Sequence, residues 1–225
     1  MGTKFVGFFG PDGVGKSTHV ALLESYLKSK GYKVKTVWMR GPHTLAFVVS
    51  SILFRLGRTR ETVNPYGRVK KVTRISSHTI WKNLWALVEL VSVIPIIVLK
   101  VIIPKKLGYN IIADRYVPDT IVSIAYTLED AEFVDGRIAH ALMTFIPTES
   151  FFFHLDADYP SLKKRRGKLV EPEAFIEFQK KCYQKIGSLI PNCYIDTSDT
   201  TVEQTASIIQ TPLNKITNCE KDDHE

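Results

Sequence analysis

The chain of 225 residues is long enough for one well-buried α/β domain, and its 44% hydrophobic and 24% charged residues exclude a disordered or collagen-like body. The formal net charge is +7, but the basic residues are spread along the chain apart from Lys163–Arg166 and Lys168, so we expect a solvated surface and no nucleic-acid partner. The cysteines Cys182, Cys193 and Cys219 lack zinc or CxxC spacing, and the chain does not start with a signal-peptide pattern. We therefore expect reduced thiols and a cytoplasmic protein.

Short apolar runs alternate with helical patterns along the chain. This alternation predicts a three-layer α/β fold with a parallel five-stranded sheet flanked by helices. The expected strands are Lys4–Phe9, Lys33–Met39, Tyr109–Ala113, Ser150–Leu155 and Cys193–Ile195. The clearest expected helices are Ser17–Lys30, Glu173–Leu189 and Thr201–Leu213. We expect one domain over residues 1–213 and a loose polar tail over residues 214–225.

The stretch Leu84–Pro104 is almost entirely apolar and approaches the length of a membrane span. Glu89 and Lys100 would be costly at bilayer depth, and Pro95 interrupts the run. We therefore favour a buried helix, or two such helices broken near Pro95. Contact with a membrane surface or with a partner protein is the second interpretation, and a true span is the third.

A phosphate-binding sequence follows the first expected strand and opens the first expected helix. Residues Gly10–Ser17 fit the pattern G-x-x-x-x-G-K-[ST] in full, and the strand-to-helix context is the one in which such a loop binds phosphates. Backbone N–H groups and the helix N-terminus attract phosphate oxygens, Lys16 reaches the β and γ phosphates, and Ser17 is a Mg²⁺ ligand. We therefore predict a P-loop NTPase fold that binds ATP and Mg²⁺. The predicted nucleotide-binding residues are Gly10, Asp12, Gly13, Val14, Gly15, Lys16, Ser17 and Thr18.

Two further groups of charged residues follow expected strands. Asp114 is placed to help hold Mg²⁺, or to accept a proton, and the adjacent Arg115 suits the phosphate of an acceptor. The cations of Lys163–Lys168 lie in a segment over residues 159–172 that we interpret as a lid over the triphosphate, with a solvated basic helix as the alternative. The predicted catalytic residues are Lys16, Asp114, Arg115, Arg165 and Arg166.

Together these motifs resemble the thymidylate kinase family of nucleoside monophosphate kinases. The resemblance extends from Phe5 to about Leu213 and rests on the phosphate loop with Asp12 at its third position, on Asp114-Arg115-Tyr116, and on Leu155–Asp158 before the lid. It implies that Asp12 contacts the sugar of the acceptor nucleotide. It also implies that Arg40 and Arg115 hold the acceptor phosphate, and that the lid arginines act on the transferred group.

The sequence departs from the family pattern on the acceptor side. Asp119 stands where the family has a serine, and Ala125-Tyr126 is followed by Thr127. The family's acceptor-site arginine motif is not recognisable, although Arg74 is a candidate replacement. The predicted acceptor-binding residues are Asp12, Arg40, Arg74, Arg115 and Tyr116.

The leading hypothesis is a kinase that transfers the γ-phosphoryl of ATP to a nucleoside monophosphate, most simply dTMP. The alternatives are a kinase with another small or lipid-like acceptor, which the apolar stretch favours, and a nucleotide-binding regulatory protein with slow hydrolysis. The resemblance further raises the hypothesis of a homodimer through the apolar region Trp81–Ile103.

Overall fold

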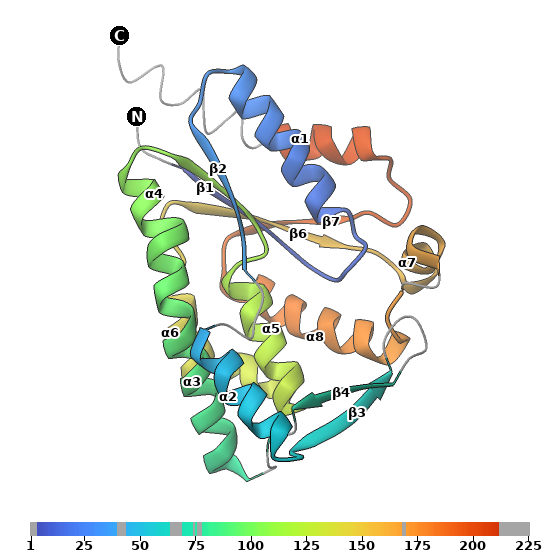
Figure 1. Ribbon diagram of the computed structural model, residues 1–225. Helices are drawn as coiled ribbons and strands as arrows, with labels where there is room; N and C mark the ends of the chain where they lie inside the picture. Colours follow the sequence, from blue (N-terminus) through green and yellow to red (C-terminus); the bar gives the residue numbers. More distant parts are fainter. Residues whose placement is uncertain are drawn as a thin grey trace.

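The computed structural model describes residues 4–39, 44–63, 69–73, 75, 78–167 and 170–211. Five parallel strands form the central sheet in the order β2-β5-β1-β6-β7 (Figure 1). The strands are β1 (Phe5–Phe9), β2 (Val34–Trp38), β5 (Asn110–Asp114), β6 (Ser150–Asp156) and β7 (Asn192–Asp196). The predicted three-layer fold class is therefore confirmed, and all five predicted strands are present to within one or two residues.

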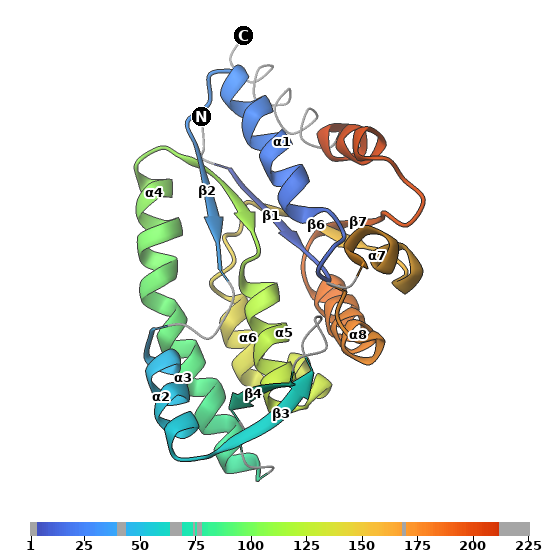
Figure 2. The same cartoon turned by 45° about the vertical axis from the view of Figure 1, so that its right-hand side comes forward.

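Helices cover both faces of this sheet (Figures 1 and 2). One face carries α1 (Lys16–Ser29) and a helix over residues 202–211, and its core contains Val6, Phe8 and Phe153. The other face has its core around Phe5, Phe9 and Phe152. The helices on that side include α3 (Thr79–Ile97), α5 (Val117–Leu128), α6 (Arg137–Met143) and α8 (Glu173–Leu189). Alternate residues of β1 thus serve opposite cores, as the two-residue period of a strand requires.

Two elements beside the sheet were not predicted. A helix, α2 (Thr44–Arg55), packs on α3, and an antiparallel hairpin of β3 (Thr59–Val63) and β4 (Val69–Thr73) lies next to it. The segment of α2 reads as a nearly continuous apolar run without a clear period, so the sequence did not separate a helix from a strand there. A short helix, α7 (Tyr159–Arg166), follows β6, where the lid was expected.

The structure shows one continuous helix in place of two helices broken near Pro95, and it corrects the expectation that this helix is buried. Residues Thr79–Lys106 form one helical rod in which a π-helical turn (Val98–Ile102) joins α3 to α4 (Ile103–Lys106). Pro95 lies inside α3, where it removes one backbone donor, and the π-helical turn begins three residues after it. The rod is long and apolar enough to cross a membrane, with a mean hydropathy of 2.6, yet only 33% of its apolar window is buried.

Candidate active site

The phosphate-binding loop joins the central strand β1 to α1, at the carboxyl edge of the sheet where ligands bind in parallel α/β folds. At two positions of the loop only glycine fits, because the backbone is left-handed and neighbouring atoms leave no room for a Cβ. A Cβ on Gly10 (φ 138°) would lie 1.9 Å from the carbonyl oxygen of Leu155, and one on Gly13 (φ 98°) would lie 2.6 Å from Cδ of Arg166. The loop is therefore held between β6 on one side and α7 on the other.

Lys16 is the first residue of α1, directly after the phosphate loop. The Lys16 ammonium is buried and donates hydrogen bonds to the carbonyl oxygens of Gly10 (2.7 Å) and Pro11 (2.5 Å). Ser17 and Thr18 are exposed, whereas the side chain of Val14 belongs to the core. Val14 and Gly15 thus contribute only their backbone to the loop. The ammonium group of Lys16 lies at the loop, and phosphate oxygens would attract it away from the two carbonyl oxygens.

Ser17 and Asp114 form a pair whose chemistry fits a magnesium ion. The Ser17 hydroxyl donates a 2.5 Å hydrogen bond to Oδ2 of Asp114, across the junction of α1 and β5. The other carboxylate oxygen of Asp114, Oδ1, is buried and has no hydrogen-bond partner among the described residues. No group of three or more His, Cys, Asp or Glu side chains is placed for a metal in the described part of the chain. A Mg²⁺ ion here would therefore take its remaining oxygen ligands from the nucleotide and water, which is its usual coordination at phosphates.

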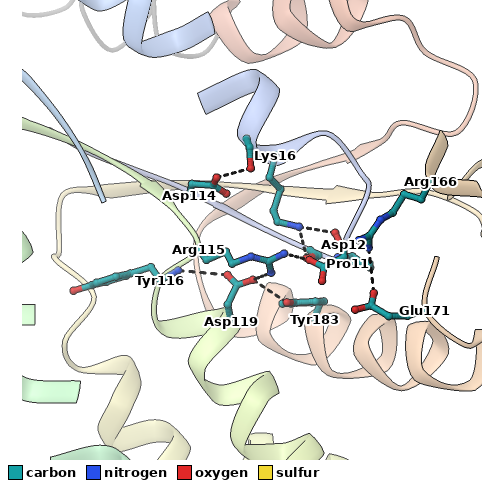
Figure 3. Close-up of polar contacts among 12 residues, drawn as sticks. Pro11, Asp12, Lys16, Asp114, Arg115, Tyr116, Asp119, Arg166, Glu171 and Tyr183 are labelled. Atoms are coloured by element: carbon teal, nitrogen blue, oxygen red, sulfur yellow. Dashed lines mark hydrogen bonds and ion pairs between the residues drawn. The ribbon is translucent and has the colours of Figure 1, made fainter. Parts of the chain in front are cut away.

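Arg115 is the centre of an ion-pair network that joins the phosphate loop to α5 (Figure 3). Its guanidinium contacts Oδ1 of Asp12 in the loop, and its Nη1 lies 2.7 Å from Oδ1 of Asp119. The hydroxyl of Tyr183, on α8, donates to that same Asp119 oxygen at 2.9 Å. Burial opposes the charge of Arg115, but Asp119, Tyr183 and Glu171 together outweigh it, so the pKa is raised and the guanidinium stays charged. The network therefore holds a charged guanidinium, paired with two carboxylates, beside the loop.

The two lid arginines lie in different places. Arg166 packs its side chain over Gly13, and its Nη1 donates to Glu171 at 3.3 Å, so it lies on the phosphate loop. Figure 3 shows it directed toward Asp12. Arg165 instead donates to the hydroxyl of Thr197 at 3.0 Å and to the carbonyl of the same residue. Arg165 thereby connects α7 to the end of β7. This position does not support the expectation that Arg165 acts on the transferred phosphoryl group.

Three predicted acceptor residues need separate comment. Tyr116 points away from the other site residues (Figure 3), because its ring packs on Phe5 in the core and its hydroxyl donates to the carbonyl of Phe145 at 2.9 Å. We therefore correct the prediction that its side chain contacts the acceptor. Burial also raises the pKa of this phenol. Arg40 and Arg74 lie outside the described residues.

The sequence analysis did not assign roles to Asp119, Tyr183, Glu171 and Thr197, which position the site's arginines and the loop. The Thr197 hydroxyl, just after β7, lies 2.9 Å from the carbonyl oxygen of Asp156 and 3.3 Å from that of Val14, so it contacts the phosphate loop from the end of β7. Tyr183 and Thr197 are far from Arg115 and Val14 in sequence, and no local pattern marks them. Asp119 had a weak signal, since it follows Arg115 by one helical turn at the start of α5.

Comparison with known proteins finds thymidylate kinases both by sequence and by structure. No protein-family model matches the chain. A segment of 53 residues, 24% of the chain, is 45% identical to a thymidylate kinase of Caldicellulosiruptor saccharolyticus and covers 26% of that protein. The structure of a thymidylate kinase from Candida albicans superposes with a TM-score of 0.59, over 96% of this chain and 93% of that one, at 17% identity. This is a thymidylate kinase fold.

The sequence match and the fold match name the same family, and the motif-based resemblance to thymidylate kinases is thereby confirmed. The sequence match spans 26% of the length of the Caldicellulosiruptor protein, and the structural match over the whole chain has only 17% identity. The reaction, its substrates and its partners are therefore argued from the site.

Proposed function

We propose that the protein transfers the γ-phosphoryl group of ATP to a nucleoside monophosphate, with dTMP as the first candidate. The observation that carries this proposal is the position of Arg115. This charged guanidinium is fixed between Asp12 and Asp119 beside the loop, and Arg115 directly follows Asp114 of the Ser17–Asp114 pair. A kinase needs, besides the triphosphate site, a cation that holds the acceptor phosphate in line with the γ-phosphate, and Arg115 lies beside the loop where such a cation is needed.

The side chains divide the work of such a transfer between donor and acceptor. The Lys16 ammonium exchanges its two loop carbonyls for the β and γ phosphate oxygens, and Ser17 with Asp114 holds the metal. When bound, Mg²⁺ neutralises charge on the transferring group. Arg115 orients the acceptor phosphate, and Arg166 covers the loop at Gly13 and adds positive charge there.

The remaining acceptor contacts rest on the resemblance. In this proposal Asp12 binds the sugar of the acceptor, Arg40 binds its phosphate, and Arg74 replaces the family's missing acceptor-site arginine. Asp12 is already engaged by Arg115, so the acceptor would meet a paired carboxylate and guanidinium. The Candida albicans enzyme is described as having broad substrate specificity, and the acceptor here need not be restricted to dTMP.

A second candidate keeps the same chemistry and uses a lipid-like acceptor. The observation that favours it is the exposed apolar side of the α3–α4 rod, where Leu84, Leu87 and Leu99 face outward. We rank it second because the Arg115 network lies at the phosphate loop, whereas the rod is on another side of the molecule (Figure 1). In either case the partners are small-molecule substrates. We place the protein in the cytoplasm, in keeping with the free thiols of Cys182 and Cys193.

An acceptor panel tests the proposal. Purified protein with ATP and Mg²⁺ is assayed for ADP release with dTMP, dUMP, the other monophosphates, thymidine, a lipid extract and no acceptor. We expect a rate that depends on dTMP and that falls on the order of 100-fold or more in Lys16→Ala and in Arg115→Ala, because each removes a charge that the transition state needs. The control is Lys28→Ala, an exposed position on the same helix as Lys16.

The outcomes separate the candidates. A rate with the lipid extract alone would favour the second candidate. ADP release that no acceptor stimulates, together with normal ATP binding, would overturn both and leave a nucleotide-binding regulatory protein.

A further inference from the structure

Asp119 is a buried carboxylate in the first turn of α5, in contact with Arg115 (Figure 3). Its side chain is 1% exposed, and its Oδ1 lies 2.7 Å from Nη1 of Arg115 and accepts a 2.9 Å hydrogen bond from the hydroxyl of Tyr183. Its other oxygen accepts the backbone N–H of Tyr116 at 3.4 Å, as part of the cap of α5. Donors from α8 and from the start of α5 therefore hold this carboxylate in place.

Asp12 is the second carboxylate on Arg115, and its surroundings differ. It lies in the phosphate loop, and its side chain is 12% exposed. The guanidinium contacts Asp12 through Nη2 and Asp119 through Nη1, so the two carboxylates use different nitrogens of one rigid fork. The Asp12 side of the fork is therefore the side nearer to solvent.

An acceptor phosphate that binds Arg115 has to compete with these carboxylates. A phosphate monoester adds a charge of about −1.5 to −2 to a guanidinium that two carboxylates already neutralise. Displacing Asp119 would leave a buried carboxylate without its cation, which is strongly destabilising. Displacing Asp12 moves a carboxylate that is already closer to water. The exchange is therefore less costly at Asp12.

We propose that Asp119 is the positioning residue of Arg115 in phosphoryl transfer, and that Asp12 is the partner that the acceptor phosphate replaces. This inference rests on the proposed function, in which Arg115 holds the acceptor phosphate. Asp119 fixes Nη1 and with it the plane of the guanidinium, and Tyr183 fixes Asp119. The nitrogen that Asp12 releases, Nη2, then faces the acceptor as a donor with a fixed direction.

The anchoring carboxylate is a feature of this chain. Asp119 stands where the family pattern has a serine, and a serine hydroxyl carries no charge with which to pair Arg115. The role of Asp119 is therefore argued from its contacts and not from the resemblance.

Steady-state kinetics of the full chain separate positioning from a general effect on the fold. We expect Asp119→Asn to raise the KM for dTMP by about 10-fold, because a neutral amide holds a guanidinium less firmly. The KM for ATP should change by less than about two-fold, because the phosphate loop is untouched. Tyr183→Phe removes only the hydroxyl behind Asp119 and should raise the KM for dTMP by about three-fold. The matched controls, Asp135→Asn and Tyr109→Phe, make the same changes at exposed positions.

A probe without a nucleoside tests the exchange at Asp12. Methyl phosphate carries the phosphate of the acceptor alone, and it should inhibit the dTMP-dependent rate by competition with dTMP. Asp12→Asn removes the competing charge, so we expect inhibition at about five-fold lower concentration than in wild type. Asp119→Asn should require a higher concentration than wild type, because Arg115 is no longer fixed. A lower concentration in both variants would show that Asp119 only competes with the phosphate, and it would overturn the inference.

Urea unfolding tests the pair of Arg115 and Asp119 without reference to activity. Asp119→Asn should lower the urea midpoint of wild type and raise that of Arg115→Ala, in which the buried carboxylate has lost its cation. The same change in both backgrounds, or a KM for ATP that rises together with the KM for dTMP, would contradict the inference. A wild type without any acceptor-dependent rate would instead contradict the proposed function, and the urea data would still show whether Asp119 holds Arg115.

Discussion

Arg115 has a strained backbone that is held in place by contacts of its side chain. Its backbone is left-handed (φ 78°), a conformation that costs a non-glycine residue about 1 kcal/mol. The turn directs its side chain back toward the phosphate loop, where the carboxylates of Asp12 and Asp119 hold it. Strain of this kind concentrates at functional sites because the surrounding contacts offset it. Here the offset comes from two ion pairs and from the hydroxyl of Tyr183 behind Asp119.

Asp114 gives the sharpest prediction at the scale of one residue. Asp114→Asn keeps the shape of the side chain but removes the charge from the pair with Ser17, so we expect the Mg²⁺ concentration for half-maximal rate to rise by about 10-fold or more. The measurement is a Mg²⁺ titration of the phosphoryl-transfer rate at saturating ATP. Asp135→Asn, at an exposed position away from the loop, is the control. An unchanged titration in Asp114→Asn would show that the metal is held elsewhere.

At the scale of an element, β6 carries a buried histidine behind the phosphate loop. His154 stacks on Phe9 with ring centroids 4.6 Å apart and is 3% exposed. Burial lowers its pKa to about 4; Asp156 opposes this shift, and Lys16 and Lys180 add to it. The histidine is therefore neutral in the folded protein at neutral pH.

This histidine should make the fold sensitive to acid. The pKa of His154 is about 4 when folded against 6.5 when unfolded, so the unfolded state binds the proton first as the pH falls. Stability is unaffected above pH 6.5 and declines between about 6.5 and about 4, by up to about 3 kcal/mol. In His154→Phe, which keeps an aromatic ring, urea unfolding should show a smaller loss over this range. An equally steep loss in the variant would assign the acid sensitivity to other groups, among them His19, whose pKa burial also lowers.

The α3–α4 rod is an element whose two sides have different neighbours. Apolar residues lie on both of its sides, and a helix of that kind is ordinarily buried on both. The domain covers only the inner side, where Ser92 hydrogen-bonds to α2 and Trp85 enters the core. The outer side is exposed at Leu84, Leu87 and Leu99.

At the scale of the whole molecule, binding of nucleotide should stabilise the fold, because the phosphate loop is held by β6, β7 and α7 at once. With ATP and Mg²⁺ at about 100 times the dissociation constant, the stabilisation is about 2.7 kcal/mol. For a chain of this size that corresponds to a rise in Tm of about 5–10 °C. Thermal unfolding of wild type, Lys16→Ala and the Lys28→Ala control measures it. An undiminished shift in Lys16→Ala would mean that the nucleotide binds outside the loop.

The layout separates two surfaces. The phosphate loop, Arg115 and α7 lie at the carboxyl edge of the sheet, and α2 and the rod run along another side of the molecule (Figures 1 and 2).

The sequence by itself determined the features that depend on local chemistry. The five strands follow from short apolar runs, and the loop Gly10–Ser17 follows from a spacing that only a strand-to-helix turn around phosphates requires. Asp114 and Arg115 were found for the same reason, since side chains just past parallel strands gather at one edge of the sheet.

Only the tertiary structure decided the features that depend on distant neighbours. It placed Arg166 over the phosphate loop and the adjacent Arg165 against Thr197. Consecutive side chains of a helix point in different directions and therefore meet different partners. It placed the ring of Tyr116 in the core and brought Tyr183 to Asp119. It also showed that the apolar helix is covered on one side and bare on the other, since composition records how apolar a segment is and packing alone determines what covers it.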